Sequence, residues 1–367
     1  MARRKQDKTN GHSITRRGAV ATAAAALAIA GSGSGMGAGL GAGLGAARAT
    51  TVQPADAGTG RVLRQRVQAW LATLDEGQRD RATFAFDSRT RRAWNYMLGS
   101  RFANGLALEQ MRGPQKDAAR DVLATALSAW GLETAENIML QQDILRDEWG
   151  KGSAERNRER FSMQVFGTPS ADAPWAWRWE GHHLTITVTM IGDAVVSTTP
   201  KAFSSEPNTV PSGPYRGLVV LENEALGRTL FGDLGAGARR AALLRDRSYG
   251  NILAKPGREA TISRREGLAL GDMTPGQADI ARRLVALYTS EHLAGPLAAD
   301  AAARIAGEDE AAIRFGWAGP NQAGESLYYR LHGQGFLIEF ATLFGQPEHH
   351  HTVVHDLQRN FGDHLLG

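Results

Sequence analysis

A run of alternating side chains from Trp175 to Ser197 constrains the fold more than any other feature of this sequence. It reads WAWRWEGHHLTITVTMIGDAVVS and is rich in β-branched and aromatic residues. Because successive side chains of a strand point to opposite faces, the pattern predicts strands that turn at residues 191–193. Near the C-terminus, IRFGWAG, SLYYRLHG, GFLIEFATLF and HHHTVVHD predict a second block of strands, with a hairpin turn at residues 332–335.

Helical periodicity fills the chain before and between these blocks. Apolar residues recur every three or four positions from about residue 60 to 150, and again in ENEALGRTLFGDL and TPGQADIARRLVALYTSEHL, which predicts amphipathic helices. Gly131 is expected to separate two helices, with Thr134 capping the second. No internal repeat is visible in the sequence.

Two blocks of strands with segregated helices predict an α+β fold. We expect an N-terminal helical subdomain packed on antiparallel β-sheet elements that carry the histidine clusters. Residues 50–367 are expected to form a single domain, with a helical part at 50–155 and a mixed β/α part at 156–367.

Residues 1–49 resemble an export signal of the twin-arginine type. The start is basic, Arg16 and Arg17 precede the apolar run AVATAAAALAIA, and a Gly/Ala-rich stretch leads to the small-residue pattern Ala47-Arg48-Ala49. We therefore expect export to the periplasm or the extracellular space. The apolar run is shorter than the roughly 20 residues that span a bilayer, so no integral membrane span is expected.

The basic balance of the chain comes mostly from that segment. The 367 residues include 42 Lys and Arg and 38 acidic residues, of which residues 1–49 hold seven and one. The remaining 35 basic and 37 acidic residues give a net charge near −2, which offers no basic face for nucleic acid. There is no cysteine, so any metal must be bound by His, Asp or Glu.

The uneven distribution of histidines is the main chemical signal. Phosphate-binding glycine loops, HExxH and the serine-hydrolase elbow are missing, whereas GHH at 181–183 and PEHHHTVVHD at 347–356 hold six of the ten histidines. Strand alternation places His349 and His351 on one face and His350 on the other. His182 continues the apolar row of the first strand block, where a buried polar group needs a partner.

One ion would satisfy several of these groups together with Glu339, which interrupts the apolar strand GFLIEF. The expected metal ligands are His182, Glu339, His349 and His351, a set that suits Zn, Fe, Mn or Cu. His183 and Glu180 are the candidates for moving protons. The alternatives are a hydrogen-bonded core histidine at 182, an ion pair between Glu339 and Arg330 or Arg178, and a solvated HxH strand.

Several segments together resemble one known family. PWAWRWEGHHLTITVTM, STTPKAFSSEPNTV, FGWAGP with SLYYRLHGQGFLIEF, and EHHHTVVHDLQRNFGDHLL resemble the family catalogued as domain of unknown function 3500. The resemblance covers about residue 60 to the end, and the GHH and HxHT elements are its most specific parts. The resemblance implies this order of elements, and it does not indicate any particular activity.

The leading functional hypothesis is an exported metal-dependent enzyme, hydrolytic or oxidative, with a transition-metal cofactor. The alternative is a non-catalytic exported protein that binds a metal or a small-molecule ligand. An open coordination position beside a pocket would favour the enzyme. A small molecule is the candidate partner, and nucleic acid is not.

We predict that export depends on Arg16 and Arg17 and yields a chain that starts close to Thr50. Lysine at both positions should trap the precursor in the cytoplasm, because the signal is defined by the arginine pair. Fractionation and N-terminal sequencing test this. Export of the double variant at the normal level would replace the twin-arginine interpretation by a general secretory signal.

Overall fold

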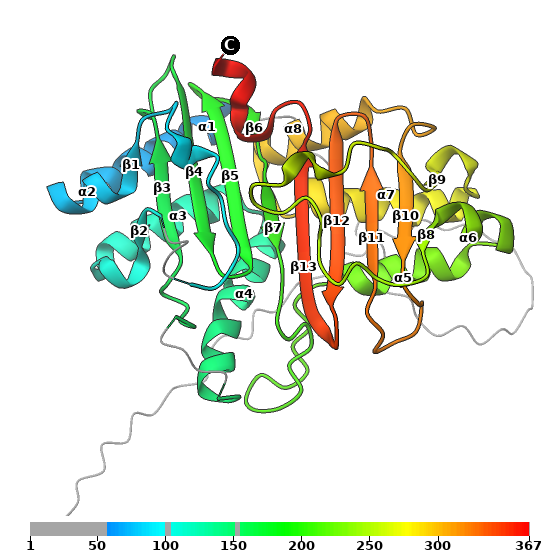
Figure 1. Cartoon of the computed structure of the whole chain (residues 1–367). Helices are drawn as coiled ribbons and strands as arrows, with labels where there is room; N and C mark the ends of the chain where they lie inside the picture. Colours follow the sequence, from blue (N-terminus) through cyan, green and yellow to red (C-terminus); the bar gives the residue numbers. More distant parts are fainter. Residues whose placement is uncertain (1–56, 100–103, 151–154, 367) are drawn as a thin grey trace, which may run out of the picture. The chain divides into compact units, whose positions relative to one another are not determined.

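The two blocks of alternating sequence pair side by side in one 13-stranded sheet (Figure 1). The computed structural model describes residues 57–99, 104–150 and 155–366, and all of them belong to a unit that spans residues 51–367. The main strand order is β1-β3-β4-β5-β7-β13-β12-β11-β10-β8. The pairs β1–β3 and β10–β8 are parallel, and the long central pairs are antiparallel. The predicted α+β class is confirmed.

The first block consists of β1 (Thr83–Phe84), β2 (Leu106–Ala107), β3 (Ser162–Phe166), β4 (Pro174–Gly181), β5 (Leu184–Ile191), β6 (Ala194–Ser197) and β7 (Lys201–Phe203). The second consists of β8 (Leu243–Arg245), β9 (Leu268–Ala269), β10 (Arg314–Ala318), β11 (Tyr328–His332), β12 (Phe336–Leu343) and β13 (Gln346–Asp356). The predicted turns at 191–193 and 332–335 lie between β5 and β6 and between β11 and β12.

The helices occur as two sets of four. They are α1 (Ala57–Ala72), α2 (Glu76–Ala82), α3 (Gly113–Ala126) and α4 (Ala129–Asp147), followed by α5 (Asn223–Asp233), α6 (Ala236–Ala242), α7 (Pro275–Thr289) and α8 (Gly295–Ala306). Their ends follow local chemistry, as at α7, where Thr274 and Gln277 form a capping box and Pro275 is the first helical residue. None of the helices in the described part of the chain combines the length and hydropathy needed to cross a membrane.

The larger helices cover one face of the sheet, and long loops cross the other (Figure 1). Apolar residues of α1 and α3 pack with the face of β5 that carries Leu184, Ile186 and Val188, and α7 packs with β11 and β12. On the opposite face, Trp94 and Tyr96 from one loop join a smaller cluster with residues of β12 and β13. We call these two sides the helix face and the loop face.

The structure contains an internal repeat, contrary to our interpretation of the sequence. The elements from α1 to β7 recur in the same order from α5 to β13, with β13 in the place of β6 and β7. A short motif, GLALxxM, occurs at equivalent places, 105–111 and 267–273, ahead of α3 and α7. Little else of the sequence matches, so the repeat is recognisable mainly from the order and pairing of elements.

Matching strand registers define which residues of the two halves correspond. Ile186, the third residue of β5, pairs with Lys201 of β7, and Ile338, the third residue of β12, pairs with Val354 of β13. Lys201 and Val354 therefore occupy equivalent positions. They also pair with each other, so the two halves meet at this point.

The expected break at Gly131 is wrong. The break lies at Leu127 and Ser128, and the Ser128 hydroxyl caps α4 by accepting from the Gly131 N–H at 3.0 Å. Gly131 is required for a different reason, because a Cβ added there would lie 2.1 Å from the His292 carbonyl oxygen. The same carbonyl accepts the Ser128 N–H at 3.0 Å, which holds the two chain segments close together.

The predictions for residues 1–49, including Arg16 and Arg17, lie outside the described residues.

We predict that Gly131→Ala lowers the free energy of unfolding by about 1 to 3 kcal/mol, because the new methyl group overpacks the contact with His292. Gly113→Ala is the matched control, since that glycine also lies in the first turn of a helix and has nothing within 4 Å of an added Cβ. The control should be neutral or slightly more stable. Equal urea midpoints for both variants would contradict the packing argument.

Candidate metal centre

The histidine pair of the first half lies in the turn between β4 and β5, where Gly181 pairs with Leu184. His183 has φ 70°, in the left-handed region that costs a non-glycine residue about 1 to 2 kcal/mol. Its N–H donates to the Tyr96 carbonyl at 2.9 Å, and its own carbonyl accepts the Ser204 N–H at 2.8 Å. The backbone is therefore held in place by chain segments on both sides of the turn.

The other histidines lie on β13 and alternate as predicted. His349 and His351 are on the loop face, whereas His350 is on the helix face. The Nε2 of His350 lies 2.8 Å from Glu224 of α5, and its ring contacts Phe340 edge-on. The prediction that His350 points away from its two neighbours is confirmed.

The turn and β13 bring three imidazoles together. The Nε2 of His349 lies 3.0 Å from that of His183 and 3.1 Å from that of His351. Among the described residues these three form the group of ligand atoms that could hold a metal ion, all within 4.8 Å of one another. Ligands at about 2.0 to 2.1 Å from one ion, at octahedral or tetrahedral angles, lie about 2.8 to 3.4 Å apart, so the spacings of His349 to His183 and to His351 fit a shared ion.

The hydrogen bonds of the Nδ1 atoms indicate which nitrogen of His349 and of His351 carries the proton. Nδ1 of His351 lies 2.8 Å from Oδ1 of Asn251, and Nδ1 of His349 lies 3.1 Å from Oε1 of Gln346. An amide oxygen only accepts, so both Nδ1 atoms carry the proton and donate it. The two Nε2 lone pairs then face each other, which is repulsive without a cation between them. Hydrogen bonds from the outer nitrogens to acceptors are also the usual support of metal-bound histidines.

Burial keeps the rings in the neutral form that metals require. Desolvation, followed by the neighbouring histidines, lowers the pKa of His183 and of His351 well below the ordinary value. Protonation of one of these rings therefore does not readily relieve the lone-pair repulsion, whereas a metal ion can. The group is a fitting site for a transition metal.

Solvent reaches the site through His349, whose side chain is 13% exposed, whereas His183 is fully buried. His349 lines a cavity of about 480 Å³ together with Trp149 and Glu206. A carboxylate oxygen of Glu206 lies 3.7 Å from Nδ1 of His349, so the outer side of this ligand faces negative charge. One of the three possible ligands, His349, thus lies in a cavity wall.

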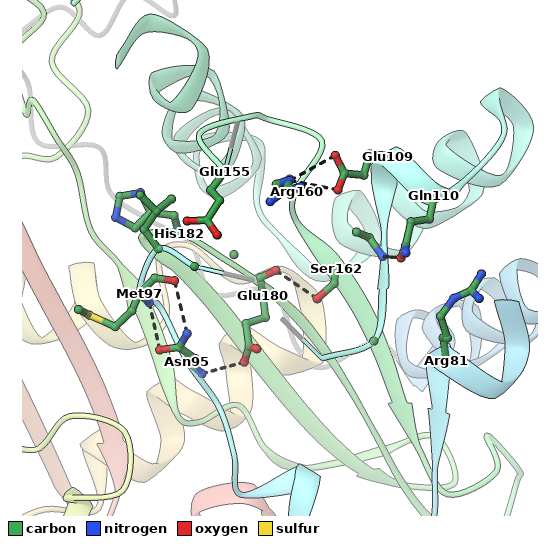
Figure 2. A pocket seen from close by; sticks show the side chains of 15 residues that line it. Arg81, Asn95, Met97, Glu109, Gln110, Glu155, Arg160, Ser162, Glu180 and His182 are labelled. Carbon is green, nitrogen blue, oxygen red and sulfur yellow. Dashed lines mark hydrogen bonds and ion pairs between the residues drawn. The ribbon is translucent and has the colours of Figure 1, made fainter. Parts of the chain in front are cut away.

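His182 lies beside the triad formed by His183, His349 and His351. Its ring stacks on His183 at 3.7 Å between centroids, and its Nδ1 is 2.7 Å from Oε1 of Gln142. It lines a second cavity of about 330 Å³, where it lies near Met97 and Glu155 (Figure 2). The sequence pattern predicts strand conformation at residues 182 and 183, but these residues form a turn, and alternation does not continue through a left-handed residue.

Glu180 lies in the wall of the same cavity and points toward Asn95 (Figure 2). Its carboxylate accepts the Asn95 N–H at 2.8 Å and lies 3.2 Å from Nε of Arg178. Burial raises the pKa of Glu180 to about 7, against the opposing effects of Arg178 and the Asn95 N–H. A carboxyl group with a pKa near neutrality can both donate and accept a proton.

Glu339 is placed on the loop face but outside the triad. Its oxygens accept the N–H groups of Leu253 and Ala254 at 2.8 and 2.7 Å and the Tyr328 hydroxyl at 2.8 Å. These three donors satisfy the buried carboxylate that the sequence argument assigned to the metal. Neither the loop that supplies them nor the support of His351 by Asn251 could be read from the strand pattern.

Comparison with known protein families assigns most of the chain to one family. The profile of the family described as Protein of unknown function (DUF3500) matches residues 57–363, which covers both halves of the repeat. Comparison with curated proteins and with solved structures found no match.

We predict that Glu180→Gln changes the pH dependence of stability. A pKa raised from 4.5 to about 7 means that the folded state holds this proton more tightly than the unfolded chain does. Ionisation of Glu180 therefore costs stability as the pH rises from 4.5 through 7. Relative to the wild type, the glutamine variant should gain free energy of unfolding between pH 4.5 and pH 8. Urea titrations at both values test this, and a constant difference would contradict it.

Proposed function

We propose that this chain, which belongs to the Protein of unknown function (DUF3500) family, is a metal-dependent enzyme whose ion is bound by Nε2 of His183, His349 and His351. The convergence of three Nε2 atoms, with spacings of 3.0 and 3.1 Å along the group, carries the proposal. The Nε2 lone pairs of His349 and His351 face each other at 3.1 Å, because both Nδ1 atoms donate to amide oxygens, and a shared cation would relieve this repulsion.

The number of ligands favours catalysis over a structural role. Structural zinc sites are closed by four protein ligands, whereas catalytic sites have three and keep a position open. The described residues supply three, which would leave a position open for a further ligand. The ligand count supports an enzyme over a protein that only stores or is stabilised by a metal.

The donor set narrows the choice of metal. Imidazole ligands suit Zn, Cu and Fe, whereas Mn prefers carboxylate and carbonyl oxygen. Since Glu339 is bound by three donors elsewhere, the inner ligands are nitrogen only. We therefore favour Zn, Cu or Fe over Mn.

The chain's own groups then take distinct roles. An ion at this position would polarise a substrate oxygen or a water molecule. Asn251 and Gln346 orient two of the rings through their Nδ1 atoms, and His183 is a ligand and so is not available to move protons. Glu180 is the proposed general acid or base in the adjoining cavity. Hydrolysis and oxidation are both compatible with this arrangement.

Export is the second part of the proposal. It is supported by the basic start, the arginine pair and the apolar run in residues 1–49. Twin-arginine export carries proteins that are already folded, which suits a protein with a buried ion that must be inserted before secretion.

We predict that His349→Ala, His351→Ala and His183→Asn each abolish stoichiometric metal, as measured by elemental analysis of untagged protein. Asparagine is chosen at 183 because it tolerates the left-handed backbone. The metal-loaded wild type should melt at a higher temperature than its chelated form, because an ion that binds only the native state stabilises it. The three variants should show no such difference.

His350→Gln and His182→Gln are the matched controls, since both keep a hydrogen-bonding side chain outside the triad. Each should retain metal. Equal metal content in all five variants would exclude the site. Metal binding without any metal-dependent hydrolysis of ester or phosphodiester substrates, or any oxygen consumption, would instead favour the non-catalytic binding protein.

A further inference from the structure

A lysine is buried where the two halves meet. Lys201 of β7 is 1% exposed, and its Nζ donates to the carbonyl oxygen of Thr289, the last residue of α7, at 2.7 Å. Desolvation lowers the pKa of Lys201 to about 7, and no carboxylate opposes this effect. A large part of the population is thus a neutral amine at neutral pH, which is a nucleophile.

The internal repeat shows that the fold does not require a lysine here. The equivalent residue of the other half is Val354, which belongs to the apolar cluster beneath α7. A buried amine without an acidic partner is costly compared with an aliphatic residue. Because the lysine occurs in one half and not in the other, its presence indicates a role other than packing.

Lys201 also lines a cavity of about 270 Å³ between α8 and the ends of β12 and β13. The two acidic residues of its wall are already engaged: Asp356 pairs with Arg304 at 3.2 Å, and Glu308 accepts the N–H groups of residues 334 and 335. Arg359 is exposed, and within the described residues no ion pair of its guanidinium is observed. Besides uncharged polar side chains, the groups left to meet a ligand are therefore the Lys201 amine and the Arg359 cation.

We propose that this cavity binds a small anionic aldehyde or ketone, such as a 2-oxo acid, and that Lys201 forms an imine with it. The Nζ lone pair attacks the carbonyl carbon and forms a C–N bond. Two protons leave the nitrogen, and the carbonyl oxygen departs with them as water, so no oxidant or reductant is needed. Arg359 at the mouth would pair with the carboxylate. The inference is independent of the metal centre.

A purely structural role for Lys201 is the competing explanation. An ammonium group at the C-terminus of α7 would interact favourably with the helix dipole and would donate to the Thr289 carbonyl, a carbonyl of the last helical turn. That role predicts an unreactive lysine, whereas imine formation predicts a selectively reactive one. The two explanations therefore give different chemical labelling.

The test treats the full chain at pH 7 with glyoxylate and sodium cyanoborohydride, which reduces an imine to a stable secondary amine. Intact mass and peptide mapping should show one adduct at Lys201, formed about tenfold or more faster than at Lys116 or Lys255, because only Lys201 lines the cavity proposed to bind the carbonyl compound. Lys201→Met, which mimics the valine of the other half, should fold and lose the adduct. Similar labelling of all three lysines, or unchanged labelling of the variant, would overturn the proposal.

Arg359→Gln tests the anionic part. It should raise the glyoxylate concentration that gives half-maximal labelling and leave labelling by uncharged acetaldehyde unchanged. An equal effect on both probes, or no effect on either, would overturn the assignment of an anionic ligand. His351→Ala should leave the labelling of Lys201 intact, so failure of the metal proposal can be distinguished from failure of this one.

Discussion

The pairing of β7 with β13 is the constraint on which the site depends. Lys201 pairs with Val354, and the backbones of Ser205 and His350 exchange hydrogen bonds of 3.0 and 2.9 Å. This junction joins the two halves into one sheet and holds the HxH segment beside the turn that carries His183. A slip of one residue would turn His350 toward the turn and send both ligands to the helix face. The register of one strand pair therefore decides whether three imidazoles meet.

Around this junction, the protein buries several polar groups that have specific partners. His350 contacts Glu224, Glu339 accepts three donors, and Glu180 has both Asn95 and Arg178. The triad is different, because its own members face each other through the nitrogens that bind metal. Facing metal-binding nitrogens of this kind favour an external partner such as a metal ion.

The internal repeat provides a reference for judging single residues. The turn that carries His182 and His183 corresponds to the Gln334-Gly335 turn of the other half, and Lys201 corresponds to Val354. At the lysine position the second half has an aliphatic residue that suits the fold, whereas the first half has one that costs desolvation. The two turns differ in backbone conformation, because the left-handed residue His183 occurs in the first half alone. Functional positions commonly carry such local costs.

The sequence by itself determined the strand and helix blocks, the faces of His349, His350 and His351, and the exclusion of cysteine chemistry, because these depend on local periodicity and composition. Tertiary structure alone decided that His183, and not His182, joins the triad, since a left-handed turn residue breaks the alternation on which the prediction relied. It also decided that Glu339 is satisfied by backbone donors from a distant loop. Likewise, the partners of Lys201 come from elements far apart in the chain, and their meeting depends on sheet order and register, which local patterns do not encode.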